Sequence, residues 1–263
     1  MADPKQTTLH PTAVVEDGAE LGPGVEVGPY AVIGGRVRIG ANTRIAAHAV
    51  VLGETALGED NRIHSFATVG GVPQDLKHDG GASRLELGNG NVIREYATLH
   101  TGTEDGGGLT RVGDGNFFMA YTHVAHDCQI GDGIVMANCA TLAGHVRIED
   151  RAILGGLSAI HQFARVGESA FIAAGAMVSL DVPPFSRVGG DRARLLGVNA
   201  VGLKRRGFTP NTVAAVKRAY RLIFREDIAL ADGLELAEAE LGDVAEVMRL
   251  IGFVRGSERG CCR

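Results

Sequence analysis

The sequence has no tryptophan, and its aromatic residues make up only 5% of 263 residues. Aromatic side chains dominate many cores, so this composition argues against a conventional core. The four cysteines, at positions 128, 139, 261 and 262, form no CxxC pair, which indicates neither a zinc finger nor a disulfide framework. No segment approaches the roughly 20 apolar residues of a membrane span. We therefore expect a cytoplasmic protein with reduced thiols and no stable membrane insertion.

Positive charge is not in excess either. The chain has 31 acidic residues against 26 lysines and arginines, a formal net charge of −5. This balance argues against nucleic-acid binding through a bulk basic surface. Glycine, by contrast, is abundant, with 38 residues spread along the chain and not gathered in a linker. We interpret them as serving a repeated backbone requirement, namely the conformations that turns need.

A six-residue period runs through most of the chain. Aliphatic residues recur at every sixth position from Val15 to Val69 and from Leu87 to Leu99, and apolar residues do so from Val112 to Val178. The fourth residue after each is usually small or β-branched. A period of six fits neither an α-helix nor a long strand. It predicts a parallel β-helix, in which short strands and tight turns stack one inward side chain per face.

This repeat resembles that of the hexapeptide-repeat acyltransferases, whose domains are left-handed parallel β-helices with three hexads per coil. The left-handed sense is implied by the resemblance, because parallel crossovers are ordinarily right-handed. We therefore expect an all-β solenoid followed by a small α domain. The β-helix is expected over residues 1–190, with loops near 75–86 and 103–110, where the repeat is interrupted. Loops projecting from a rigid scaffold often carry function.

A C-terminal helical domain is expected over residues 191–263. Residues 185–208 have no clear pattern and are expected to be irregular. Thr209 and Pro210 then form a helix start, with threonine as the cap and proline at the first helical position. Further amphipathic stretches near 228–241 and 243–255 predict two more helices. The final residues, GSERGCCR, are expected to be frayed.

Histidines gather in the second repeat block. With three hexads per coil, His126 lies directly below Gly144, next to His145, and both His161 and His100 fall near the same strip. Imidazole can accept a proton from a sugar hydroxyl near neutral pH. Asp127 follows His126 and could stabilise the imidazolium, and the Gly144 N–H could donate to a thioester oxyanion.

Longer motifs resemble the UDP-N-acetylglucosamine O-acyltransferases of lipid A biosynthesis. They are HVAHDCQIGDG, NCATLAGHVRIED, GLSAIHQFARVG, GVNAVGLKRRGF and PQDLKHDGGASRLELGNGNVIREYATLHTGTEDGGGLT. The resemblance implies transfer of a 3-hydroxyacyl group from acyl carrier protein to the 3-hydroxyl of UDP-N-acetylglucosamine. It implies a catalytic set of His126, Asp127 and Gly144. It also implies substrate contacts by Gln74, Asp75, Lys77, His100, His123, His145, His161, Gln162, Asn199, Arg205 and Arg206.

Two positions depart from the family pattern. Val201 replaces a residue that is often acidic, which affects the expected nucleoside contact. Ala174 stands where glycine commonly ends the acyl pocket. An added methyl group there should disfavour the longest acyl chains, since filled pockets tolerate extra volume poorly. We therefore interpret Ala174 as a ruler of acyl length.

The resemblance further implies a homotrimer with active sites between neighbouring prisms, and no metal or other cofactor. A single prism offers flat faces, whereas binding sites are concave. Acidic acyl carrier protein needs a basic surface, and the candidates are Lys217, Arg218, Arg221 and Arg225.

Three other readings stay open. Another sugar or amino-sugar acyltransferase of this fold is the nearest, although the N-acylating type usually carries an extra N-terminal domain, and here the hexads begin by residue 15. A zinc carbonic anhydrase on the same fold would need histidine ligands shared between subunits. A non-enzymatic β-helix that binds ice would need a regular outward ladder of threonine, and no outward position repeats in that way.

Overall fold

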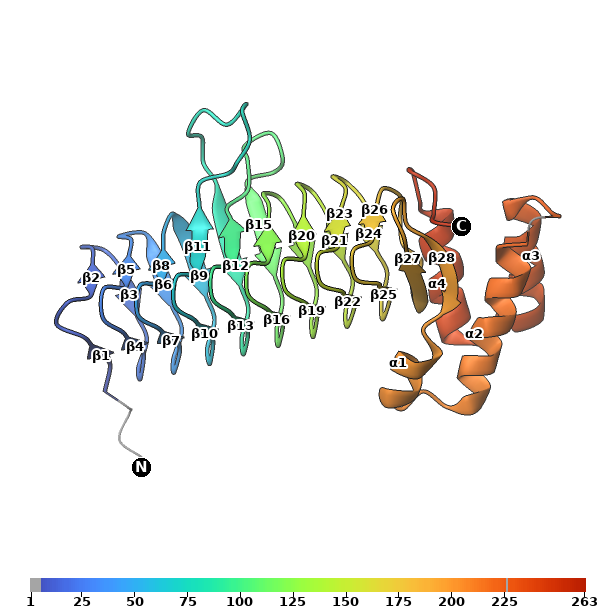
Figure 1. Cartoon of the computed structure of the whole chain (residues 1–263), viewed down its shortest axis with the longest axis horizontal. Helices are drawn as coiled ribbons and strands as arrows, with labels where there is room; N and C mark the ends of the chain where they lie inside the picture. The colour runs from blue at the N-terminus through green and yellow to red at the C-terminus, as the bar shows by residue number, and fades with distance from the viewer. Residues whose placement is uncertain (1–5, 226) are drawn as a thin grey trace.

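The computed structural model describes residues 6–225 and 227–263. Short parallel strands stack into three sheets that form the sides of a long prism, and helices follow at its C-terminal end (Figure 1). Each strand pairs with the equivalent strand of the next coil, as Val14 pairs with Val32 and Val32 with Val50. Tyr30 and Thr12, 18 residues apart, bond across neighbouring coils. The β-helix predicted from the hexads is confirmed.

Within the described residues the strands fall into three sheets. Sheet 1 comprises β1 (Thr8–Leu9), β4 (Glu26–Val27), β7 (Arg44–Ile45), β10 (Arg62–Ile63), β13 (Val92–Ile93), β16 (Phe117–Phe118), β19 (Val135–Met136), β22 (Ile153–Leu154), β25 (Phe171–Ile172), β27 (Ser186–Gly189) and β28 (Arg194–Val198). Sheet 2 comprises β2 (Val14–Val15), β5 (Val32–Ile33), β8 (Val50–Val51), β11 (Thr68–Gly71), β14 (Thr98–His100), β17 (His123–Val124), β20 (Thr141–Leu142), β23 (Ala159–Ile160) and β26 (Met177–Val178). Sheet 3 comprises β3 (Glu20–Leu21), β6 (Val37–Ile39), β9 (Glu54–Leu57), β12 (Arg84–Leu87), β15 (Leu109–Val112), β18 (Gln129–Ile130), β21 (Arg147–Ile148) and β24 (Arg165–Val166).

The core is a thin column of aliphatic side chains. The hexad residues of sheet 2 stack directly on one another, and Ile33, Val51, Val69, Leu99 and Val124 are all fully buried. Removing this apolar area from water stabilises each coil on the next, at about 25 cal/mol per Å². A repeat protein of this kind is therefore held together by contacts between neighbouring coils.

The role expected for glycine is confirmed at left-handed turns such as that at Gly24, but it does not account for every glycine. Gly40, which follows the hexad residue Ile39, does not adopt a left-handed conformation. A methyl group on Gly40 would lie 2.5 Å from the carbonyl carbon of Gly58, so glycine is needed there for the close approach of two coils. Several left-handed turn positions are instead occupied by larger residues, such as Tyr30 and Phe66.

Two loops leave the prism along the same edge, where the chain passes from sheet 2 to sheet 3 (Figure 1). The first spans residues 72–83, between β11 and β12, and the second spans residues 101–108, between β14 and β15. The predicted ranges ran two to three residues too far, because β12 and β15 are four-residue strands that begin before the hexad beat resumes. Leu85, in β12, is already fully buried.

The β-structure continues beyond residue 190, contrary to the predicted boundary. β27 pairs with β25 in parallel, and β28 then returns antiparallel beside it, with a shift of register near Arg187. Helix α1 (Ala200–Arg205) follows directly. The prediction of irregular structure over 185–208 was wrong because an antiparallel hairpin carries no hexad and α1 is too short to show a helical period.

Three longer helices complete the module. They are α2 (Pro210–Ile223), α3 (Leu230–Leu241) and α4 (Ala245–Arg255). The predicted start of α2 is confirmed: the Thr209 side chain accepts a hydrogen bond from the Thr212 N–H. The helices share a core with Phe185 and Leu203, which joins them to the end of the prism. No helix of the described chain combines the length and apolarity needed to cross a membrane.

The C-terminal tail packs against the prism and is not frayed. Cys262 N–H donates to the Asp181 carbonyl at 2.8 Å, and Asp181 N–H donates to the Gly260 carbonyl at 3.0 Å. Cys261 and Cys262 are both buried. Burial raises the pKa of the Cys262 thiol to about 11. The polar residues of GSERG led to the prediction of a frayed tail. The two cysteines instead behave as small apolar residues and are buried.

Candidate active site

Sequence-distant polar residues meet along one edge of the prism, which we call the His126 edge. It consists of the turns from sheet 2 to sheet 3 in three successive coils, residues 125–128, 143–146 and 161–164. The turns bond to one another, since His145 N–H donates to the His126 carbonyl at 3.0 Å. Both loops project from this same edge. His126, His145 and His161 lie in its three turns, as the 18-residue spacing predicted.

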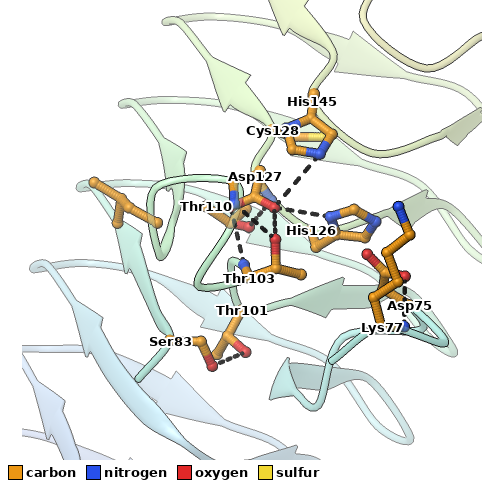
Figure 2. Close-up of polar contacts among 12 residues, drawn as sticks. Asp75, Lys77, Ser83, Thr101, Thr103, Thr110, His126, Asp127, Cys128 and His145 are labelled. Carbon is orange, nitrogen blue, oxygen red and sulfur yellow. Dashed lines mark hydrogen bonds and ion pairs between the residues drawn. The ribbon is translucent and has the colours of Figure 1, made fainter. Parts of the chain in front are cut away.

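His126 and Asp127 form a buried pair at the centre of this edge. Nδ1 of His126 lies 2.8 Å from Oδ2 of Asp127 (Figure 2). Their side chains are only 9% and 2% exposed, respectively. A hydrogen bond between an imidazole and a carboxylate is stronger when water is excluded. The arrangement leaves Nε2 as the ring nitrogen that can act on a bound molecule.

Asp127 is fixed from several sides. Thr103 donates twice, from its N–H to Oδ1 at 2.9 Å and from its hydroxyl to Oδ2 at 2.6 Å. The Asp127 N–H donates in turn to the hydroxyl of Thr110 at 2.8 Å (Figure 2). Hydrogen bonds to a charged group contribute about 1.5–3 kcal/mol each. Thr103 and Thr110 were not predicted as site residues.

Gly144 and His145 lie one coil further along. Gly144 is buried against the His126 ring, and no acceptor in the described residues takes its N–H. Nε2 of His145 is 3.8 Å from Oδ2 of Asp127, and its ring is perpendicular to that of His126. Burial is the largest cause that lowers the pKa of His145, and the nearby His126 adds to it, although Asp127 opposes it. His145 is therefore favoured as a neutral side chain.

The first loop brings Asp75 and Lys77 to the same place (Figure 2). The Lys77 N–H donates to Oδ1 of Asp75 at 3.0 Å. This bond is the largest cause that lowers the pKa of Asp75, and the positive charge of Lys77 adds to it. Gln74 is exposed beside them. The loop thus supplies a carboxylate and an ammonium group beside the pair of His126 and Asp127.

His100 and His123 form a second histidine pair, in adjacent strands of sheet 2. Their ring centroids are 5.2 Å apart. Nδ1 of His100 donates to the Val72 carbonyl at 2.6 Å, and Nδ1 of His123 is hydrogen-bonded to the Thr98 hydroxyl at 2.7 Å. Burial, with the nearby His100 and His126, lowers the pKa of His123 to about 4. His123 is therefore neutral at physiological pH.

His161 and Gln162 lie at the far end of the His126 edge. The Arg259 guanidinium, from the C-terminal tail, is 3.2 Å from Nδ1 of His161. A cavity of about 710 Å³ opens beside this edge, lined by Asp127, His145, Arg147, Phe163 and Arg259, among others. The tail therefore forms part of the wall beside the site, which was not predicted because the tail was expected to be frayed.

Four predicted site residues lie on other edges of this chain. Asn199 caps α1, where its side chain accepts from the Gly202 N–H and donates to the Ser169 carbonyl. Arg206 bonds to the same serine, and Arg205 is exposed. These residues lie near the edge between sheets 3 and 1, and the exposed Ala174 lies on the edge between sheets 1 and 2. A single chain does not bring them to His126.

Two other chemistries can be considered at this edge. Cys128 is buried beside Asp127, and burial raises the pKa of its thiol to about 12, which opposes a role as a nucleophile. His126, Asp127 and His145 place ligand atoms within 4.8 Å of one another. The His126 and Asp127 atoms are, however, at hydrogen-bonding distance, so a metal ion between them would have to displace the shared proton.

Known proteins resemble this chain along its whole length. One family model, bacterial transferase hexapeptide (six repeats), matches residues 109–144, and another, UDP N-acetylglucosamine O-acyltransferase domain 2, matches residues 181–262. The acyl-[acyl-carrier-protein]--UDP-N-acetylglucosamine O-acyltransferase of Myxococcus xanthus is 52% identical, covering 97% of this chain and 99% of the relative. The protein of the same name from Alkalilimnicola ehrlichii is 50% identical, covering 98% of this chain and 100% of the relative.

The chain belongs to the UDP-N-acetylglucosamine O-acyltransferase family. Solved structures agree. The UDP-N-acetylglucosamine acyltransferase of Bacteroides fragilis superposes with a TM-score of 0.95 at 38% identity, covering 97% of this chain and all of that one. The one from Francisella novicida gives 0.94 at 37% identity, covering 97% and 94%. The fold is thus the left-handed β-helix expected for this acyltransferase family, and the chain is an acyltransferase.

In this member of the UDP-N-acetylglucosamine O-acyltransferase family, the site residues that were not predicted from the sequence are those that position the predicted ones. Thr103, Thr110 and Arg259 contact His126-edge residues but carry no catalytic signature of their own. One signal was available for Thr103. Thr103 lies in the segment that shifts the phase of the hexads. Segments that form a functional site often depart from the sequence pattern of the surrounding fold.

Proposed function

We propose that this protein transfers a 3-hydroxyacyl group from acyl carrier protein to the 3-hydroxyl of UDP-N-acetylglucosamine, with His126 as the general base. The product is that of the first step of lipid A biosynthesis, which takes place in the cytoplasm. The observation that carries the proposal is the buried hydrogen bond of 2.8 Å between Nδ1 of His126 and Asp127. The family to which the chain belongs supports the same reaction.

The pair has the polarity that this chemistry needs. Asp127 accepts at Oδ2, so Nδ1 of His126 carries the proton and Nε2 carries the lone pair. Nε2 takes the proton of the sugar 3-hydroxyl while the oxygen of that hydroxyl attacks the thioester carbonyl. Asp127 stabilises the imidazolium that forms. Collapse of the tetrahedral intermediate breaks the C–S bond, and His126 returns its proton to the departing thiolate of the carrier.

Gly144 supplies the oxyanion donor in this proposal. Its N–H is not used by another group in the described chain, and its Cα lies against the His126 ring. Removing one such donor from an acyl-transfer site typically costs about 10²–10³ in kcat. His145, held neutral by burial, completes the polar wall without adding a second positive charge beside the imidazolium.

The sugar contacts come from the loops and from neighbouring histidines. Asp75 and Lys77 lie beside His126 and can bind hydroxyl groups of the sugar. Gln74, His100, His123, His161 and Gln162 are proposed as the remaining contacts to the sugar and acyl groups. The acceptor is proposed to be the ordinary sugar with a 3-hydroxyl, in preference to a 3-amino analogue, because that is the acceptor in the names of the relatives.

The complete site requires more than one chain. Asn199, Arg205, Arg206 and Ala174 lie on edges away from His126, yet they are proposed to hold the nucleotide and the end of the acyl chain. A homotrimer would reconcile these positions with the proposed roles, because cyclic symmetry places a different edge of a neighbouring prism opposite each His126 edge. We therefore propose a homotrimer with sites between subunits.

The test is acyl transfer measured with purified 3-hydroxyacyl-acyl carrier protein and UDP-N-acetylglucosamine. His126→Ala should lower kcat by at least about 10³-fold, as loss of a general base and its partner does in acyl transfer. His10→Ala, in the exposed first coil, is the matched control and should retain activity. Transfer should also persist after treatment with a chelator, since no step uses a metal ion. A fully active His126→Ala protein would refute the proposed base.

A further inference from the structure

We infer that Thr103 is a positioning residue that holds Asp127 and thereby sets which nitrogen of His126 carries the proton. The inference rests on the proposed function, because it concerns the base named there. Thr103 belongs to the second loop, residues 101–108, and its side chain is buried against Asp127 (Figure 2). Its hydrogen bonds within the described residues go to Asp127 and Gly106 and not to His126, so it acts through the carboxylate.

The hydrogen-bond directions at Thr103 are determined by a third group. The Gly106 N–H donates to the Thr103 hydroxyl oxygen at 3.1 Å. The Thr103 hydroxyl proton therefore points to Oδ2 of Asp127, 2.6 Å away, while the Thr103 N–H donates to Oδ1 at 2.9 Å. Two donors from one residue grip both carboxylate oxygens. This fork fixes the plane of the carboxylate.

The carboxylate has a competing partner on its open side. Nε2 of His145 is 3.8 Å from the same Oδ2 that accepts from Nδ1 of His126 at 2.8 Å. A modest rotation about the Asp127 side chain would favour His145 over His126. Without an acceptor at Nδ1, neutral His126 is free to carry its proton on Nε2, where it cannot remove a proton from the sugar.

The backbone around Thr103 is built for this contact. A methyl group on Gly102 would lie 2.7 Å from Oδ1 of Asp127, and one on Gly106 would lie 2.1 Å from Oδ2. Glycines on both sides therefore allow the loop to close over the carboxylate. The segment that interrupts the hexad repeat delivers the fork to Asp127, which gives this insertion a function in the reaction.

The experiment compares three variants of the full-length protein. Thr103→Val removes the hydroxyl but keeps the shape and the N–H, and Thr103→Ser restores the hydroxyl. Thr101→Val is the matched control, because Thr101 is equally buried in the same loop but bonds to Ser83 at 3.0 Å and not to Asp127. Measured quantities are kcat, KM for the UDP-sugar, the unfolding midpoint, and the tautomer of His126 from ¹⁵N NMR of labelled histidine.

We expect Thr103→Val to lower kcat by about 10–100-fold, the usual cost of losing such an orienting partner. KM for the UDP-sugar should change little, and the His126 signal should shift from the Nδ1–H form toward the Nε2–H form. Thr103→Ser should recover most of the kcat. Thr101→Val should retain the wild-type kcat and tautomer, whatever its effect on the unfolding midpoint.

Other results would overturn the inference. A wild-type kcat in Thr103→Val, with His126→Ala inactive, would refute the role of Thr103 and leave the proposed base intact. An equal loss in Thr101→Val, or an unchanged tautomer in a slowed Thr103→Val, would mean that the loop is merely structural. An active His126→Ala would instead remove the base, and the role of Thr103 with it.

Discussion

Gly144 lies so close to the face of the His126 imidazole that a methyl group on its Cα would be 2.5 Å from Cε1 and 2.6 Å from Nε2. Its φ angle is one that any residue can adopt, so contact with the ring and not backbone strain requires glycine here. Gly144 therefore determines where the ring sits, in addition to the oxyanion role proposed for its N–H.

We predict that Gly144→Ala lowers kcat by about 10²-fold, because the ring must move by a fraction of an ångström to about 1 Å. Steady-state kinetics with acyl carrier protein as donor checks this. Gly34→Ala is the control, since a methyl group there would have ordinary contacts at 3.5 Å and longer. A Gly144→Ala enzyme with wild-type kcat would show that the imidazole does not need its observed position.

Stability should depend on pH through His123. Its pKa is lowered to about 4 in the folded chain, chiefly by burial, against an ordinary value of 6.5. Between these values the unfolded chain binds the proton more readily, so the folded state loses stability as the pH falls from about 6.5 toward 4. Burial lowers the pKa of His145 as well, and it contributes with the same sign.

We expect the midpoint of thermal unfolding to drop by several degrees over that window, and His123→Gln to flatten the dependence. Calorimetry at a series of pH values measures both. His10→Gln, in the exposed first coil, should leave the slope as it is in the wild type. An unchanged slope in His123→Gln would mean that other groups account for the acid sensitivity.

The prism could be predicted from the sequence because each hexad marks its own inward-facing residue. One aliphatic residue every six positions is enough to predict where Val51 and Leu99 point, and both are fully buried. The pair His126 and Asp127 was likewise predictable, since the two residues are adjacent in sequence. Adjacent residues did not guarantee a contact, which depended on the left-handed turn at Asp127.

Contacts that depend on inserted segments were beyond sequence reasoning. Thr103 reaches Asp127 only because the second loop folds back over the edge, and its position there follows from glycine contacts that no period reveals. The tail is a similar case: Arg259 lies 3.2 Å from Nδ1 of His161, and the cysteines that follow it are buried. Asn199 and Ala174 lie on other edges of this chain, and only the proposed homotrimer would bring such edges to the His126 edge of a neighbouring subunit.

Helix α2 is proposed to bind the acyl carrier protein. Ion pairs within the chain distinguish which of its basic residues are available for this contact. Arg218 forms a paired contact with Glu240 at 2.8 and 2.9 Å, and Arg225 is bonded to Asp227. Lys217 and Arg221 are exposed one turn apart, and neither forms an ion pair with an acidic residue of the described chain. Their charges are therefore the ones available to an acidic partner.

We predict that Lys217→Glu with Arg221→Glu raises KM for acyl carrier protein by about tenfold or more at low salt, with a smaller effect at high salt where charges are screened. A short acyl-pantetheine donor should be used as well as before. Arg218→Gln is the control and should have a weaker effect, because its charge is already paired. Equal effects on both donors would place these residues in the site itself.

The Ala174 side chain, a single methyl group, is predicted to limit the length of the acyl chain that is transferred. It is exposed on the edge between sheets 1 and 2, and its N–H would lie 2.5 Å from a methyl group added to Gly155, so the backbone there is tightly packed. If its side chain ends the acyl pocket, Ala174→Gly makes room for a longer chain. The expected change is about tenfold in the ratio of kcat/KM between a longer and a shorter donor, since one methylene in an apolar pocket is worth about 1–3 kcal/mol.

The measurement is competition between acyl carrier proteins that carry 3-hydroxyacyl groups of increasing length. Ala47→Gly, at the equivalent turn position of an early coil, is the control and should leave the ratio unchanged. If the preferred length is the same in Ala174→Gly, another residue ends the pocket.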